Sequence, residues 1–210
     1  SRSAAGAGGI GDSENPVISP DGRFVVFESA ADNIATGDSN GDWDILLQDV
    51  QTFEAEVVST DSAGNQANGS SYDPAISDDL RYVVFESLAN NLVTPTVPGD
   101  VQIYLKDRRT GETKLLTFSH DGSNSGVGDL TSRDPDISGD GRYAVFQSES
   151  TNLVPGVTGF NRDIYVVDTR RDTVARVSVD DIGTQGNDHS DNPRITSDGR
   201  YIFFDSEADN

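Results

Sequence analysis

One fifteen-residue pattern occurs four times in this chain of 210 residues. Residues 15–29 read NPVISPDGRFVVFES, and similar stretches return at 73–87, 134–148 and 192–206. The shared proline occupies positions 16, 74, 135 and 193, so the copies lie 58, 61 and 58 residues apart. Such regular spacing is typical of proteins in which one supersecondary unit stacks on the next. The repeat therefore constrains the fold more than any other feature of the chain.

Each period contains four segments with the character of β-strands. In the first period these are residues 16–19, 24–29, 44–49 and 55–60. The proline of the first segment biases the preceding Asn or Asp toward extended geometry. The second segment is apolar on both alternating faces, which predicts a central strand covered on both sides. Between them, Asp21-Gly22 is a hairpin signal, because glycine supplies the positive φ of a tight turn.

No apolar stripe with the period of a helix runs for ten residues, so we expect minimal helix content. Four strands in each of several repeats are typical of the blades of a β-propeller. The sequence thus predicts an all-β fold, a β-propeller segment of about three and a half four-stranded antiparallel blades. After an inter-blade linker at 1–14, blade 1 should span 15–72, blade 2 73–133, blade 3 134–191, and the first half of blade 4 192–210.

The residues of the pattern resemble those of a known family. Pro, then Ile-Ser, then Asp-Gly-Arg-Tyr/Phe, then Val-Phe-x-Ser is similar to TolB-like propeller repeats, the Pro-Asp relatives of WD-type repeats in bacterial periplasmic and secreted proteins. Residues 33–45, NIATGDSNGDWDI, and the Gly-x-Gln linkers at 64–66 and 183–185 resemble a secreted bacterial subgroup. The resemblance implies a secreted or periplasmic bacterial propeller protein. It implies no single activity, because the family is functionally mixed.

The ends of the chain carry further expectations. Residue 1 is not methionine, so we expect a targeting segment to be absent from this chain. The last repeat stops after its second strand, and three and a half blades are too few to close a ring of the usual four to eight. Two alternatives follow: a piece of a larger propeller, or open blade edges that pair with another chain.

Charge and composition exclude several kinds of partner. The formal net charge is -21, so phosphates of nucleic acid and anionic membrane surfaces should repel the chain, and we expect no nucleic-acid partner. The absence of cysteine excludes a disulfide framework, a thiolate metal site and a cysteine nucleophile. No apolar run approaches the roughly 18 residues of a membrane span.

One loop of the first repeat has the spacing of metal ligands. Asp38, Asn40, Asp42 and Asp44 alternate around a glycine, so their side-chain oxygens could converge on Ca²⁺ as in the first half of an EF-hand loop. No glutamate follows to close the shell, and the alternative is an Asx-rich turn that leads into a strand. Trp43, in the same loop, is a candidate contact for a sugar or a protein, or else a packed rim residue.

The sequence shows no catalytic constellation. His120 and His189 lie beside aspartates in polar linkers, but adjacency in sequence is not the geometry of a triad. No Gly-x-Ser-x-Gly elbow is present. We therefore predict no enzymatic activity and a binding or scaffold module for a protein or glycan partner, with polar linkers (60–73, 118–134 and 179–192) on one face. The alternatives are a self-assembling structural subunit and a fragment of a polysaccharide-processing enzyme.

Overall fold

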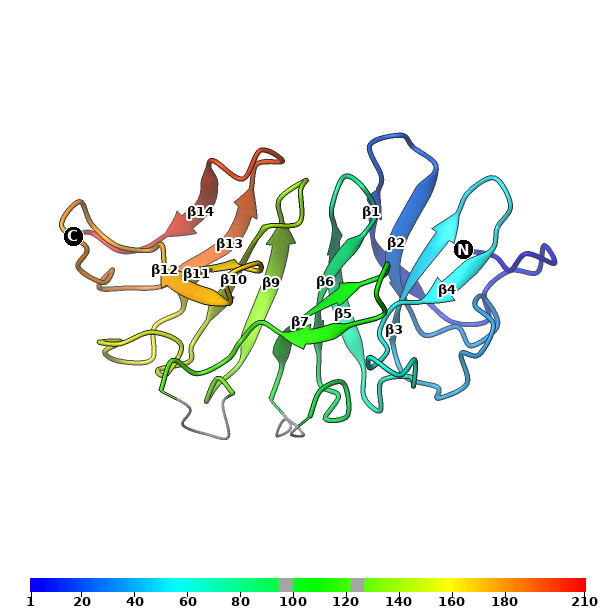
Figure 1. The fold of residues 1–210 in the computed structure, drawn as a ribbon, viewed down its shortest axis with the longest axis horizontal. Helices are drawn as coiled ribbons and strands as arrows, with labels where there is room; N and C mark the ends of the chain where they lie inside the picture. Colours follow the sequence, from blue (N-terminus) through cyan, green and yellow to red (C-terminus); the bar gives the residue numbers. More distant parts are fainter. Residues whose placement is uncertain (95–99, 122–126) are drawn as a thin grey trace.

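The computed structural model describes residues 1–94, 100–121 and 127–210, which form β-strands, turns and loops without any helix (Figure 1). None of these described residues therefore forms a helix that could span a membrane. Blade 1 consists of β1 (Ser13–Ile18), β2 (Phe24–Ser29), β3 (Asp44–Asp49) and β4 (Ala55–Val57); blade 2 of β5 (Ser71–Ile76), β6 (Tyr82–Ser87), β7 (Gln102–Asp107) and β8 (Thr113–Leu115). Blade 3 consists of β9 (Ser132–Ile137), β10 (Tyr143–Ser148), β11 (Asp163–Asp168) and β12 (Thr173–Arg176); the half-blade of β13 (Ser190–Ile195) and β14 (Ile202–Ser206).

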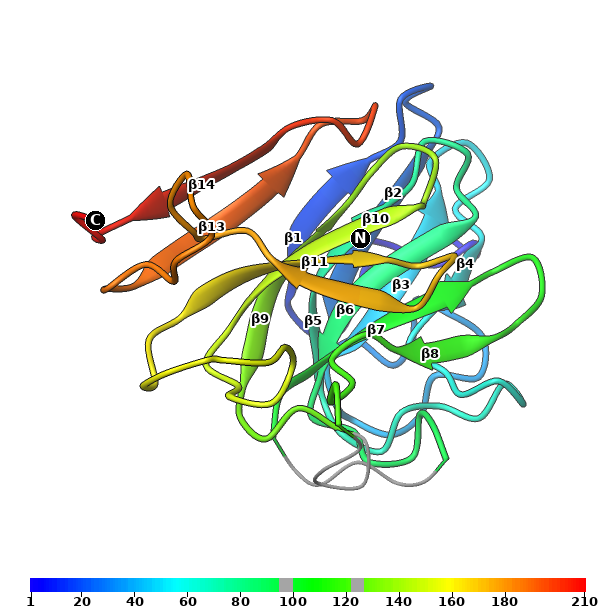
Figure 2. The same ribbon diagram turned by 60° about the vertical axis from the view of Figure 1, so that its left-hand side comes forward.

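The strands form three four-stranded antiparallel sheets and one two-stranded sheet, each ordered as in the sequence. The sheets stand side by side in an open arc, as the two views show (Figures 1 and 2). The first strand of each blade contacts the first strand of the next, so β1, β5, β9 and β13 line the inner side of the arc. This architecture confirms the predicted all-β propeller segment of about three and a half blades.

The inner strands differ in one respect from the sequence prediction. Each sheet begins two residues before the predicted blade boundary, because the strand continues through the Asx-Pro step instead of starting at the proline. A shift in pairing register occurs at each such step. The predicted extended geometry of the residue before proline is wrong: all four adopt positive φ, namely Asn15, Asp73, Asp134 and Asn192 at 45°, 48°, 53° and 55°. Asn and Asp tolerate this conformation, and the bulge aims the backbone N–H out of the sheet.

The fourth strands are also shorter than predicted. β4 ends at Val57, although the sequence suggested a strand to residue 60. Beyond it the chain leaves the sheet edge, and Thr60 pairs only with Gln66 in an isolated bridge. The linker thus folds back on itself before entering the next blade.

The hydrophobic core lies between the blades. On β6, Val83 and Phe85 point into a cluster shared with blade 1, whereas Val84 points into a cluster shared with blade 3. All three side chains are fully buried. A strand covered on both faces needs apolar residues at both parities, which is why the pattern reads Val-Val-Phe rather than alternating. This confirms the central position predicted for the second strand.

The hairpin turns also join neighbouring blades. A Cβ atom added to Gly141 would lie 2.1 Å from the ring of Tyr82 in the preceding blade, so this turn accepts only glycine, whose φ here is 68°. Gly199 approaches the ring of Tyr143 in the same way, at 2.9 Å. At the equivalent position of blade 2, Leu80 holds a φ of 63° without being glycine.

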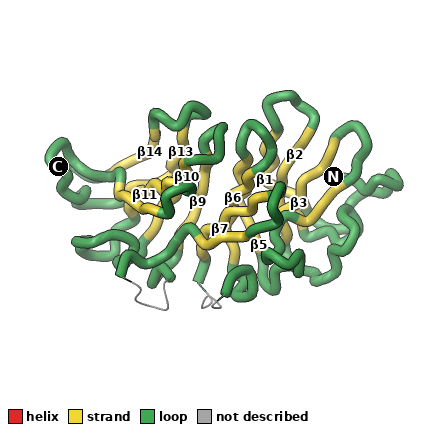
Figure 3. The backbone as a smooth tube through the Cα atoms, viewed as in Figure 1, coloured by secondary structure: helices red, strands yellow, loops and turns green. Residues whose placement is uncertain are grey.

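Loop length divides the molecule into two faces. In an antiparallel meander, successive connections alternate between the two ends of the strands. The connections at one end have 4 to 6 residues, and those at the other have 13 to 16. Over blades 1 and 2, the long connections lie along the lower edge of Figure 3. We call the end with long connections the long-loop face and the opposite end the short-turn face.

Candidate functional site

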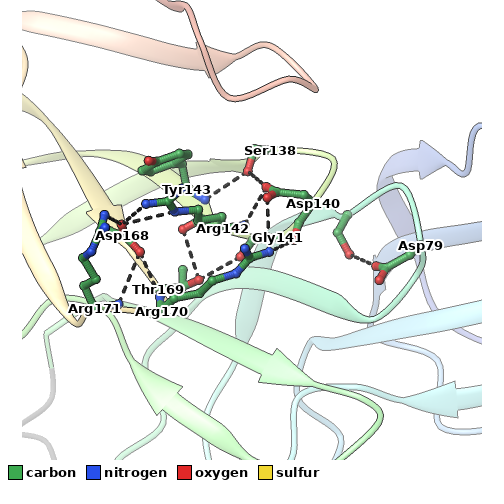
Figure 4. Close-up of polar contacts among 11 residues, drawn as sticks. Asp79, Ser138, Asp140, Gly141, Arg142, Tyr143, Asp168, Thr169, Arg170 and Arg171 are labelled. Carbon is green, nitrogen blue, oxygen red and sulfur yellow. Dashed lines mark hydrogen bonds and ion pairs between the residues drawn. The ribbon is translucent and has the colours of Figure 1, made fainter.

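Most recurring charged residues form bonds within their own blade. In blade 3, Asp140 accepts hydrogen bonds from the Ser138 hydroxyl and the Arg142 backbone N–H, and Arg142 Nη2 donates to Asp168 Oδ2 at 2.9 Å (Figure 4). The guanidinium hydrogen bonds of Arg142 lower the pKa of Asp168 to about 2. Arg81 does the same for Asp107 in blade 2. These residues stabilise the turns, and their repetition reflects the fold rather than a ligand.

The predicted calcium loop brings two of its four candidate ligands together. Asp38 Oδ1 and Asp44 Oδ2 both accept from the side-chain amide of Gln66, at 2.8 and 2.7 Å. Asp44 is fully buried, and its Oδ1 accepts from the hydroxyl of Ser59. Burial raises the pKa of Asp44 to about 6. The amide of Gln66 thus bridges the two carboxylates.

The other two candidate ligands point elsewhere. Asn40 Oδ1 accepts from the backbone N–H of Asp42, and its amide donates to the carbonyl of Ala67. Trp43 is half-buried against Tyr72, with ring centroids 6.2 Å apart. A calcium ion in this loop would require Asn40 and Asp42 to turn toward Asp38 and Asp44. Calcium binding here remains a prediction.

Both histidines hold linkers in place. His120 Nδ1 lies 2.8 Å from the carbonyl oxygen of Asn152. His189 Nδ1 accepts from the backbone N–H of Arg162 at 3.0 Å. These contacts favour a structural role over that of a general base. Residues 122–126 of the predicted linker 118–134 lie outside the described residues.

A second recurring contact joins the blades along the inner side of the arc. The residue before each proline, held at positive φ, donates its backbone N–H to an acidic or amide side chain on the second strand of the preceding blade. Three blade junctions have this bond at 2.7 to 2.8 Å: Asp73 to Glu28, Asp134 to Glu86, and Asn192 to Gln147. The bulged inner strands therefore serve to connect one blade to the next.

At the junction of blades 2 and 3, this contact gathers three carboxylates. Oxygen atoms of Asp73, Glu86 and Asp134 all lie within 4.8 Å of one another. Glu86 is 1% exposed, and its burial together with the nearby negative charges raises its pKa to about 8. Burial also raises the pKa of Asp134. We call Asp73, Glu86 and Asp134 the axial carboxylate cluster.

Sequence reasoning missed the axial carboxylate cluster. Its members lie on β5, β6 and β9, and only the stacking of blades brings them together. A signal was nevertheless present in the repeat. The first position of the pattern reads Asn, Asp, Asp, Asn, and the position before the last serine reads Glu, Glu, Gln, Asp. Only between blades 2 and 3 do these two positions supply three acids at one junction.

Solved structures share the fold of this chain. TolB from Acinetobacter baumannii is 18% identical with a TM-score of 0.58, and the match covers 94% of this chain and 38% of that protein. A putative TolB from Agrobacterium tumefaciens is 20% identical with a TM-score of 0.60, covering 93% of this chain and 54% of its own. The β-propeller domain of the Trilobed protease from Pyrococcus furiosus, described as having an open velcro topology, is 11% identical, with a TM-score of 0.50 and coverages of 94% and 43%.

These matches define the fold as that of TolB-like β-propeller repeats, as the sequence pattern predicted. The chain spans 38% to 54% of the length of the three proteins. No protein-family model and no curated protein sequence matches the chain. Because the identities are low, the likeness concerns the fold, and function has to be argued from the site.

Proposed function

We propose that this chain is a non-enzymatic binding module of a secreted or periplasmic protein, and that it contacts a protein partner through the long-loop face. The observation that carries the proposal is the confinement of all connections of 13 to 16 residues to one face. Loops supported by a rigid scaffold are where proteins place their contact residues. The opposite face offers only tight turns, whose aspartates are engaged in hydrogen bonds within the turn.

The long-loop face has the chemistry of a surface for a basic partner. Ile182 at its tip is 89% exposed and is preceded by the exposed Asp181. With a formal net charge of -21, the chain attracts cationic groups over distances of about a Debye length. An apolar side chain flanked by carboxylates suits a peptide segment that combines basic and apolar residues.

An array of basic peptides, acidic peptides and glycans probed with the labelled chain tests this proposal. We expect binding to basic peptides that falls at least fivefold in Asp181→Asn/Ile182→Ser. The matched control Glu112→Gln/Val50→Ser removes one acid and one exposed apolar side chain from the short-turn face and should bind like the unchanged chain. Binding to glycans alone would contradict a protein partner, and equal losses in both variants would contradict the choice of face.

Self-association is a second candidate function, favoured by the state of β14. Phe203 on this strand is 61% exposed, whereas its equivalents Val26, Val84 and Val145 are fully buried in the complete blades. Among the described residues no strand pairs with the outer edge of β14. An open apolar edge is a template for a strand from a second copy.

Light scattering behind size exclusion tests the self-association. We expect a discrete multiple of 22.4 kDa that Phe203→Lys converts to a monomer. Ile182→Lys places the same charge at an exposed apolar residue far from β14 in sequence and should leave the assembly intact. A monomeric unchanged chain would remove self-association from consideration.

A further inference from the structure

An amide group connects two carboxylates at the first blade junction. Asn15 Nδ2 donates to Glu28 Oε1 at 3.2 Å and to Asp73 Oδ1 at 2.8 Å. These two bonds place a positive edge between two negative groups on adjacent blades. Glu28 Oε2 accepts the backbone N–H of Asp73, so both oxygens of this buried carboxylate have donors.

The next junction has the same geometry but lacks the amide. Asp73 occupies the position of Asn15, and an ionised carboxylate cannot donate a hydrogen bond. Glu86 Oε1 still accepts the backbone N–H of Asp134 at 2.7 Å. Among the described residues, however, no hydrogen-bond donor reaches Glu86 Oε2, although the side chain is 1% exposed. Arg133 Nη1 lies 3.6 Å away on a side chain that is 53% exposed.

We infer that a calcium ion takes the place of the missing amide and binds one carboxylate oxygen each from Asp73, Glu86 and Asp134, with water completing its shell. Oxygen atoms within 4.8 Å of one another can contact one ion at Ca–O distances of about 2.3–2.6 Å with small side-chain movements. The buried, unpaired oxygen of Glu86 gains a partner, and the repulsion among the three carboxylates is relieved.

The donor set favours calcium over other metals. All three ligands are carboxylate oxygens, the atoms that hard cations prefer, and the cluster contains no imidazole or thiolate. Calcium also accepts irregular coordination, whereas Mg²⁺ demands near-ideal octahedral geometry. Asp73 and Asp134 are half-buried, which leaves the ion a route from solvent on the inner side of the arc.

Calorimetric titration of the full chain with CaCl₂, after removal of chelator, tests the inference. We expect one site with a Kd of about 0.1–1 mM, in the range of extracellular calcium modules, and at least tenfold weaker binding of MgCl₂. Asp73→Asn and Glu86→Gln should each weaken calcium binding at least tenfold. Both variants should fold, because Asn15 and Gln147 already occupy the equivalent positions in other blades. Circular dichroism verifies this.

Matched variants at other sites make the result specific. Glu28→Gln changes the equivalent residue of blade 1, and Asp38→Asn changes the predicted calcium loop; both should bind calcium like the unchanged chain. The pair Gln147→Glu/Asn192→Asp supplies three carboxylates at the junction of blade 3 with β13 and should add a second site. Terbium luminescence sensitised by Tyr72, the neighbour of Asp73, provides an independent readout and should disappear in Glu86→Gln.

The absence of calcium binding at 10 mM CaCl₂ would overturn the inference. Binding that persists in Glu86→Gln and is lost in Asp38→Asn would also overturn it and would assign the ion to the loop of blade 1. Arg133→Gln removes the positive charge nearest Glu86 and should strengthen calcium binding severalfold. No change in this variant, together with no loss in Asp134→Asn, would place the ion elsewhere.

Discussion

Replacing Phe85 with alanine should lower the free energy of unfolding by about 3–5 kcal/mol, the largest effect expected of any single substitution in this chain. Phe85 is fully buried and stacks against Tyr104, with ring centroids 6.0 Å apart. It belongs to the cluster that blade 2 shares with blade 1, so the cavity would open between two blades rather than within one. Guanidinium chloride denaturation followed by circular dichroism measures the loss.

Phe203→Ala is the matched control for this prediction. Phe203 also lies on the second strand of its sheet but is 61% exposed, so its loss should cost less than about 0.5 kcal/mol. Because repeat proteins depend on interfaces between neighbouring units, Phe85→Ala should also reduce the cooperativity of unfolding. Similar small effects of the two substitutions would mean that the blades are held together chiefly by their polar inter-blade bonds.

Stability in the presence of chelator should fall by about 2–4 kcal/mol between pH 5 and pH 8, and Glu86 should cause the largest part of this loss. Burial raises the pKa of Glu86 in the folded chain to about 8, from 4.5 in the unfolded chain. The folded state therefore holds the proton more tightly, so folding is favoured below pH 4.5 and loses stability as pH rises toward 8. Asp73, Asp134 and Arg133 are the charged groups that face this carboxyl.

Glu86→Gln should remove most of this pH dependence and should be more stable than the unchanged chain at pH 8. Glutamine can keep the bond from the backbone N–H of the next blade, as Gln147 does with Asn192. Glu28→Gln is the control, since Asn15 already donates to that carboxylate and a smaller change is expected. Thermal unfolding at pH 5, 6.5 and 8 measures the effect. An unchanged pH profile for Glu86→Gln would show that the carboxyl of Glu86 is solvated in the folded chain.

Acid should destabilise the chain through a different set of groups. Hydrogen bonds from Arg81 hold the pKa of Asp107 at about 2, below its ordinary value of 3.8. Such a carboxylate contributes stability above pH 3.8 that is lost as pH falls toward 2. Because the Arg–Asp pairs and Glu86 act in opposite directions, the pH of greatest stability should lie near 4 to 5.

Much of the fold could be predicted because the repeat displays its own physical requirements. The run Val83-Val84-Phe85 must be covered on both faces, and the Asp-Gly turn must supply positive φ, whatever surrounds them. The bulge at the Asx-Pro step was not predicted. Steric restriction by proline argues for extended geometry, and only the bond from that residue to the preceding blade explains why the other conformation is adopted.

The candidate sites were less accessible to sequence reasoning. Asp38, Asn40, Asp42 and Asp44 have the spacing of ligands, but side-chain direction depends on partners distant in sequence, and Gln66 draws only Asp38 and Asp44 together. The reverse holds for Asp73, Glu86 and Asp134, which show no ligand spacing. The sequence by itself determined the blades, their strands and their turns, because local propensity and apolar patterning act over a few residues. Only the tertiary structure decided which carboxylates meet, because the angle between blades and the bulge of each inner strand set distances between residues up to 61 positions apart.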